Sequence, residues 1–184
     1  MRPRHAVGSV VVLVLLAAFW LMNHTASPPP PSPSSPVTAP AVQHSGRDIP
    51  VPASCTSAVN QRLADLIAQQ TTHNVDNVMA CGVTISSSRT QRGGEHGSHQ
   101  VLPLLVNLPG VGSKLVEVVT NDDLDGVVTA PKGADVYAFG QAFFDQGSRF
   151  AAGIHDVHCA THPTADNGWV VVNGVKSPAS CPSP

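Results

Sequence analysis

The clearest hydrophobic pattern in the chain is a helical stripe within residues 57–70. Its four apolar members recur at the spacing of one face of an α-helix: Val59, Leu63, Leu66 and Ile67. Thr56 or Ser57, at the start of this range, is a residue type that caps helix N-termini. The pattern therefore predicts one amphipathic helix that packs its apolar face against the rest of the domain.

Downstream of residue 80 the pattern changes to short apolar runs rich in β-branched residues, separated by turns with Gly, Pro or Asp. The expected strands are residues 82–86, 99–108, 115–120, 127–129, 135–144 and 169–175. Residues 87–97 are polar and Gly-rich and are expected to form a loop, and Pro103 predicts a bulge or an edge strand. Together with the helix, these runs predict an α+β domain: mainly an antiparallel β sheet or a small barrel, with one N-terminal amphipathic helix.

Aromatic residues add detail to two of the expected strands. Tyr137, Phe139 and Phe143 share one strand parity, which predicts that this face of the strand is buried. Trp169 follows a turn sequence and is expected to be a core residue at the start of the last strand, or a wall of a pocket beside His158.

The first 52 residues follow neither pattern. Arg2 and Arg4 precede an apolar run over residues 6–22, so residues 1–22 are expected to be a signal peptide or a signal anchor, of which we favour the anchor. Residues 23–52 are expected to be a disordered Pro/Ser-rich stalk, since residues 27–40 alone hold seven prolines. Residues 53–184 are then a single globular domain, secreted or held outside the cytoplasm by its N-terminal segment.

The charge pattern excludes one broad class of partner. From Arg47 onward there are eight Lys or Arg residues against twelve Asp or Glu residues, and the basic residues do not cluster. A mildly acidic domain of this kind lacks the basic surface of a general nucleic-acid binder. The partner is therefore expected to be a small molecule or an envelope ligand. No Gly-rich phosphate loop, Ser nucleophile elbow or dinucleotide fingerprint occurs.

Four cysteines indicate disulfide bonds, because an even number is typical of exported domains. Three pairings are open. We favour the local one, Cys55 with Cys81 and Cys159 with Cys181, over Cys55 with Cys181 and Cys81 with Cys159. The local pairing would clamp the helix to the first strand and hold the C-terminal tail beside a histidine cluster.

That cluster, residues 153–162, concentrates the chemistry of the chain. On a helix, His155, His158 and His162 would lie within about 60° of one another and could bind a divalent metal such as Zn²⁺. On a strand, His155 and Cys159 would face one side while Asp156 and His158 face the other. The sequence leaves both alternatives open.

A second pair of histidines, His96 and His99, flanks the Gly-rich loop next to Glu95. If the two regions converge, they supply either a metal site or two imidazoles for acid–base chemistry, one neutral and one charged. The plainer alternative is that these histidines are polar loop residues bonded to the backbone.

An acidic segment at residues 121–126 resembles the first half of a calcium loop, with oxygen-bearing side chains at positions 1, 3 and 5 and Gly126 at position 6. Position 12 is Lys132, where a calcium loop requires a bidentate Glu. We therefore interpret the segment as a tight acidic turn between strands.

The motifs VYAFG at residues 136–140 and GIHDVH at residues 153–158 resemble those of the YukJ-like bacterial proteins, a functionally uncharacterised family. Fainter similarity covers residues 81–175. Departures are the short interval between the motifs, the different segment at residues 159–162, and the cysteine pairs. The resemblance implies that His155, Asp156 and His158 form the shared site, and it implies no substrate.

Two functions follow from these observations. The first is a phosphodiesterase-like exported hydrolase that uses His155 and His158, with Asp156 as the residue that orients them and His99 as a partner from the second loop. The second is a non-enzymatic envelope binding domain, presented on the stalk, whose histidines are structural or bind a metal.

Overall fold

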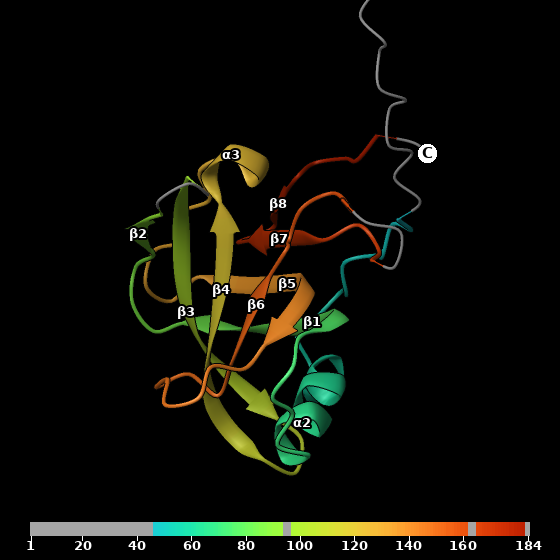
Figure 1. Cartoon of the computed structure of the whole chain (residues 1–184), viewed down its shortest axis with the longest axis vertical. Coiled ribbons are helices and arrows are strands. Elements are labelled where there is room, and N and C mark those ends of the chain that lie inside the picture. Colours follow the sequence, from blue (N-terminus) through green and yellow to red (C-terminus); the bar gives the residue numbers. More distant parts are fainter. Residues whose placement is uncertain (1–45, 94–96, 162–164, 183–184) are drawn as a thin grey trace, which may run out of the picture. The chain divides into compact units, whose positions relative to one another are not determined.

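The computed structural model describes residues 46–93, 97–161 and 165–182 (Figure 1). The predicted signal or anchor, residues 1–22, and most of the stalk lie outside these residues. Within the described part of the chain, no helix is long and apolar enough to cross a membrane.

The domain is mostly β, with few and short helices. In chain order the elements are η1 (Ser57–Asn60), α2 (Gln61–Ala68), β1 (Val75–Thr84), β2 (Arg89–Arg92), β3 (Ser98–Leu108), β4 (Gly112–Asn121), α3 (Asp122–Asp125), β5 (Asp135–Phe143), β6 (Ala152–His155), β7 (Trp169–Val172) and β8 (Val175–Ser177). The turn Asn173-Gly174 thus divides the last predicted strand into β7 and β8, because both of its residues have positive φ and reverse the chain.

Five strands close into a barrel in the order β1-β3-β4-β6-β5, with β5 pairing back to β1. All of these pairs are antiparallel except β4 with β6, which are parallel. β2 extends the sheet beside β3, and β7 and β8 extend it beside β5. The prediction of a mainly antiparallel sheet or small barrel is thereby confirmed.

The apolar core of the barrel comes from alternate positions of its strands. On β5 the residues that join the main core are small, Val136, Ala138 and Ala142. The aromatic residues have the opposite parity, so the face of β5 that they were predicted to bury lies outside the barrel interior. Phe139 is instead buried outside the main core, where its ring stacks on that of Trp169 at 6.0 Å between centroids.

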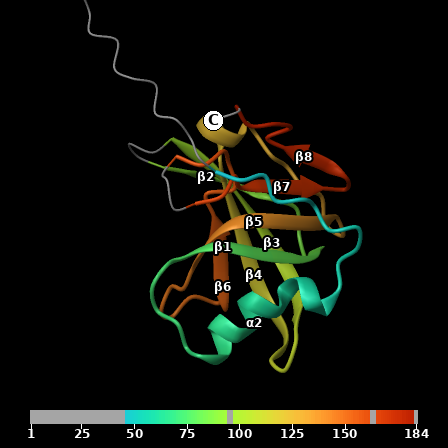
Figure 2. The same cartoon turned by 90° about the vertical axis from the view of Figure 1, so that its right-hand side faces the viewer.

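At one end of the barrel, η1 and α2 occupy the range predicted to be helical, and α2 lies against the strands in Figure 2. Leu63 is fully buried, and Leu66 and Ile67 pack against the core. Asn60 is 1% exposed and bonds three ways: its Nδ2 donates to the carbonyls of Cys81 and Asn107, and its Oδ1 accepts from the Cys81 N–H. The buried Asn60 side chain therefore has hydrogen-bond partners for both its amide nitrogen and its oxygen.

Three strand predictions need correction. Residues 127–129 form no strand, and Val127 there is 69% exposed, so the apolar run reflects no buried face. Arg89–Arg92 in the predicted loop form β2, because main-chain pairing with β3 at a sheet edge requires no apolar side chain. Pro103 lies in an unbroken register with β4 and produces no bulge.

Residues 46–52, expected to end the disordered stalk, lie along the domain instead. The Arg47 side chain forms two hydrogen bonds of 3.0 Å with the Asp166 carboxylate, and this guanidinium lowers the pKa of Asp166. The carbonyl of Ile49 accepts a 2.8 Å hydrogen bond from the Trp169 ring nitrogen. The predicted boundary at residue 52 therefore moves towards the N-terminus by at least these seven residues.

Candidate functional site

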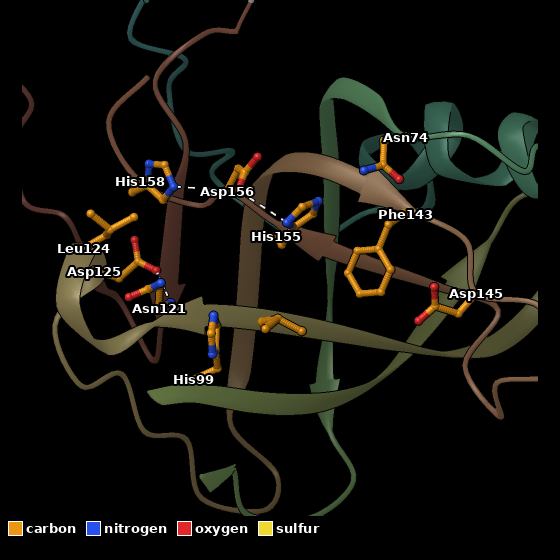
Figure 3. A pocket seen from close by; sticks show the side chains of 11 residues that line it. Asn74, His99, Asn121, Leu124, Asp125, Phe143, Asp145, His155, Asp156 and His158 are labelled. Carbon is orange, nitrogen blue, oxygen red and sulfur yellow. Dashed lines mark hydrogen bonds and ion pairs between the residues drawn. The ribbon is translucent and has the colours of Figure 1, made fainter. Parts of the chain in front are cut away.

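One pocket of about 390 Å³ brings together the residues that the sequence singled out. His99 reaches it from β3, whereas His155, Asp156 and His158 reach it from the end of β6 and the segment after it (Figure 3). The other described lining residues are Asn74, Val119, Asn121, Leu124, Asp125, Phe143 and Asp145. Barrel closure places these segments side by side, since β4 pairs with β3 on one side and with β6 on the other.

The backbone at Asp156 decides where the cluster points. β6 ends at His155, and Asp156 has φ of 52°, in the left-handed region. A continuing strand would place Asp156 and His158 opposite His155, and a helix would give the spacing needed for three metal ligands. Both expectations are wrong, because the left-handed residue turns the chain and all three side chains line the same pocket.

Two glycines leave room for this turn. A Cβ at Gly140 would overlap the carbonyl oxygen of His155, and a Cβ at Gly168 would overlap that of Asp156. The Gly168 N–H also donates a 2.7 Å hydrogen bond to the carbonyl of His158. Gly140 ends the VYAFG motif, so close backbone packing explains why that motif and GIHDVH occur together in this chain.

A chain of hydrogen bonds determines which nitrogen of the His155 ring carries the hydrogen. The Gln141 amide donates to Asp76 Oδ1 at 2.6 Å, so its Oε1 faces the other way and accepts from Asn74 Nδ2 at 2.8 Å. The same Oε1 lies 3.0 Å from His155 Nε2, which must therefore carry a hydrogen. Nδ1 of His155 is then the nitrogen that faces Asp156. The ring also meets the edge of Phe143 at 5.1 Å between centroids.

Asp156 lies between two imidazoles. Its Oδ1 is 3.3 Å from His155 Nδ1 and 3.7 Å from His158 Nε2. The other nitrogen of His158, Nδ1, donates to the Cys159 carbonyl at 2.9 Å. Interaction with Asp156 raises the pKa of His158, and burial of this ring, whose side chain is 11% exposed, partly opposes that effect. The positive form of His158 is thereby stabilised.

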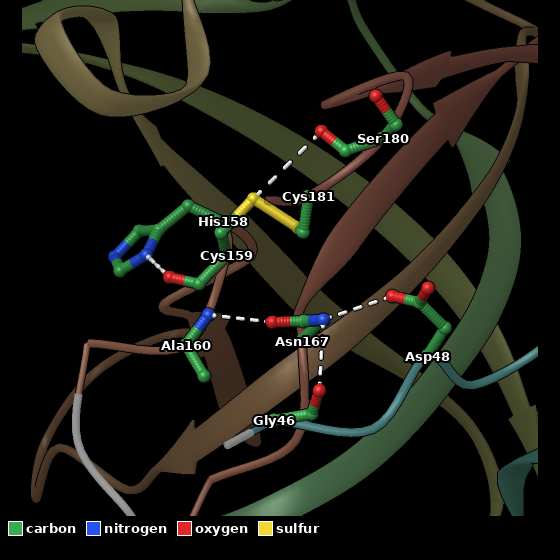
Figure 4. The surroundings of a disulfide bond; sticks show 8 residues. All are labelled: Gly46, Asp48, His158, Cys159, Ala160, Asn167, Ser180 and Cys181. Carbon is green, nitrogen blue, oxygen red and sulfur yellow. Dashed lines mark hydrogen bonds between the residues drawn. A yellow bond between two sulfur atoms is a disulfide. The ribbon is translucent and has the colours of Figure 1, made fainter. Parts of the chain in front are cut away.

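Both disulfides have the local pairing, Cys55–Cys81 and Cys159–Cys181, as predicted. They indicate an oxidising, extracytoplasmic environment. The second bond follows His158 directly, and the Asn167 side chain holds the next residue, because its Oδ1 accepts from the Ala160 N–H at 3.0 Å (Figure 4). Cys159 is consequently neither a metal ligand nor a nucleophile, and its disulfide anchors the segment that carries His158.

The acidic segment after β4 forms one helical turn, α3, and not an open calcium loop. Asn121 caps it by accepting from the Asp123 N–H, and Asp122 accepts from the Gln100 amide. Asp125 is 7% exposed; its Oδ2 accepts a 2.6 Å hydrogen bond from the Asn121 N–H, whereas its Oδ1 has no hydrogen-bond partner among the described residues. Burial raises the pKa of Asp125.

Metal binding finds no support in the described residues, where no group of three or more His, Cys, Asp or Glu side chains is arranged to hold an ion. His162, the third member of the predicted metal set, lies outside these residues, as do Glu95 and His96.

The sequence patterns do not assign to the site three residues that the structure brings there: Asp125, Gln141 and Phe143. Asp125 was visible only as part of the acidic turn. Gln141 was recognisable only by its place next to the VYAFG motif, and Phe143 had been assigned to a buried face.

Comparisons with protein-family models, with curated proteins and with solved structures found no match for this chain.

Proposed function

We propose that this domain is an extracytoplasmic hydrolase, phosphodiesterase-like, in which histidines transfer the protons. The observation that carries the proposal is the meeting of imidazoles from two distant segments in one pocket, with a carboxylate between two of them. Pockets that combine convergent polar groups with a pKa-shifted residue are the usual form of an active site.

The proton roles follow from the bonding of the two rings. His158, whose pKa Asp156 raises, is the charged imidazole and donates its Nε2 proton. His155 bears hydrogen on Nε2, so its Nδ1, which lies 3.3 Å from Asp156 Oδ1, is the nitrogen that accepts a proton. His99, from β3, contacts the substrate from another wall of the pocket.

Water is the nucleophile that this site supports. The described lining contains no Ser, Thr or Cys. In hydrolysis of a phosphodiester, the water oxygen bonds to phosphorus as its proton passes to His155. The bond from phosphorus to the leaving oxygen breaks as that oxygen takes the proton of His158. The products are a phosphomonoester and an alcohol.

The N-terminal segment completes the proposal. Residues 1–22 would tether the protein to the membrane as a signal anchor, and the Pro-rich stalk would hold the domain away from it. The resemblance to the YukJ-like proteins supports the choice of His155, Asp156 and His158 as the central residues.

The test is activity of single variants. His155→Ala and His158→Ala should each lower the rate on generic phosphodiester or ester substrates by about 10²–10⁴-fold, the usual size of general acid–base catalysis. His73→Ala, at an exposed position that is not part of the pocket lining, is the matched control and should keep full rate. A parent protein without activity on either substrate class, with or without chelator, would contradict the proposal.

The same bonds favour a second function, a non-enzymatic envelope binding domain. His155 and His158 each bond to a protein oxygen, of Gln141 and of Cys159, as structural histidines do. Metal analysis of the purified domain distinguishes structural histidines from histidines that bind a metal. A stoichiometric ion, such as Zn²⁺, lost in the His155→Ala variant would favour metal binding over a purely structural role.

A further inference from the structure

Asp125 stands out among the buried polar groups of the domain. In the part of the chain that the structure describes, two buried side-chain oxygens have no hydrogen-bond partner, Thr120 Oγ1 and Asp125 Oδ1. Only Asp125 lines the pocket, where Figure 3 shows its carboxylate beside Asn121 and below His158. A buried acceptor without a partner is costly, and one that lies at a pocket can gain the missing hydrogen bond from a ligand.

The surroundings restrict what that ligand can be. The described lining has no Lys or Arg, and it has three carboxylates, of Asp125, Asp145 and Asp156. A phosphodiester in this pocket would therefore be held by the donors on imidazoles and amides, whereas an anion placed at Asp125 would meet a carboxylate. A hydroxyl group fits better, because it donates to Asp125 Oδ1 and also accepts from a ring N–H.

The pocket lining suits a ligand that has both apolar and polar groups. Val119, Leu124 and Phe143 give apolar surface beside the polar groups, and Leu124 is 57% exposed at its place on α3. Sugars and polyols present both C–H surface and hydroxyls, so one molecule of this class can satisfy both parts of the lining.

We propose that Asp125 determines specificity by accepting a hydrogen bond through Oδ1 from a hydroxyl of a sugar-like or polyol ligand. The inference rests on the proposed function in one respect: such a ligand is the alcohol part of the ester or phosphodiester that the histidines hydrolyse. Asp125 then reads a hydroxyl near the scissile bond, and the imidazoles act on the bond itself.

The decisive variant is Asp125→Asn. Its oxygen can still accept the hydrogen bond from the Asn121 N–H, whereas its NH₂ takes the place of Oδ1 and replaces an acceptor by a donor. Thr120→Val is the matched control, because it removes the other unpaired buried oxygen, one that does not line the pocket.

Binding is measured by NMR titration of the whole domain with three probes: methyl α-glucopyranoside, ethylammonium and dimethyl phosphate. We expect the glucoside to shift the amide signals of Asn121 to Gly126 and to bind about tenfold more weakly to Asp125→Asn, the size of one hydrogen bond to a charged group. Thr120→Val should bind it like the parent.

Glucoside binding that Asp125→Asn leaves unchanged would overturn the inference, as would no binding of the glucoside, or binding of ethylammonium or dimethyl phosphate in its place. These outcomes are separate from failure of the proposed function. A protein that binds the glucoside through Asp125 but hydrolyses nothing is a hydroxyl-binding domain, whereas activity lost in His155→Ala with no role for Asp125 leaves the hydrolase standing alone.

Discussion

Asn60 and Asp125 are both buried polar side chains, and they lie near the α2 end and the α3 end of the molecule (Figure 1). Asn60 makes three hydrogen bonds and joins η1 to β1 and β3. Asp125, which lines the pocket, has one buried oxygen without a hydrogen-bond partner among the described residues. The hydrogen bonds of Asn60 stabilise the fold at the α2 end. At the α3 end, where the candidate site lies, the unpaired Asp125 oxygen lowers the stability of the fold.

The largest expected effect comes from the disulfides, one in each region. The sequence separations are 26 residues for Cys55–Cys81 and 22 for Cys159–Cys181, so loop entropy predicts nearly equal losses of about 3–4 kcal/mol when either pair is changed to Ser. Only the second pair adjoins His158. Chemical denaturation should show similar losses, while only Cys159→Ser with Cys181→Ser should alter the His158 ring signals. If both double variants altered the His158 ring signals, the two disulfides would not differ in their effect on the candidate site.

Asn60→Ala should cost about 2–3 kcal/mol of unfolding free energy, because it leaves the buried Cys81 N–H and two carbonyls without their partner. Gln61→Ala, on the exposed side of the next element, serves as the control and should change little. Urea denaturation measures both. A loss for Asn60→Ala no larger than that for Gln61→Ala would mean that water replaces these bonds.

Asp125→Asn should raise the free energy of unfolding at neutral pH by about 1 kcal/mol, whereas Asn60→Ala lowers it. The reason is that a neutral amide costs less to bury than a carboxylate. The pKa of Asp125 is raised in the folded state, so its ionised form opposes folding above that pKa. The gain should therefore appear as pH rises and vanish in acid. Denaturation at several pH values checks this, and a destabilised variant would show that the carboxylate has a structural role.

The smallest effect is a change in titration. Asp156 is the main cause of the raised pKa of His158, so Asp156→Asn should lower that pKa. Because the folded pKa lies above the ordinary 6.5, this interaction stabilises the parent below about pH 6.5, and the stabilisation disappears as pH rises through the folded pKa. NMR titration of the His158 ring measures the shift. If the midpoint of the His158 titration did not change in the variant, Asp156 would not be the group that raises the pKa of His158.

Local patterns predicted a mainly antiparallel sheet or small barrel and singled out His99, His155, Asp156 and His158, but not the geometry in which these residues line one pocket. The β-branched runs identified β3, β4, β5 and β7 because alternation and turn residues act over a few positions. β2 was missed because exposed edge pairing leaves no hydrophobic pattern. The helical and strand interpretations of residues 153–162 both failed at Asp156, since its left-handed backbone depends on space left by Gly140 and Gly168.

The sequence by itself determined the concentration of imidazoles, the even set of cysteines and the tendency towards a small β domain, because composition and periodicity are local properties. Only the tertiary structure decided that His99 lines the same pocket as His155 and His158, that Gln141 sets the hydrogen on the His155 ring, and that Asp125 Oδ1 has no hydrogen-bond partner among the described residues. These facts depend on how the strands close into a barrel. Closure makes neighbours of residues that are far apart in the sequence, and no local sequence pattern shows which residues these will be.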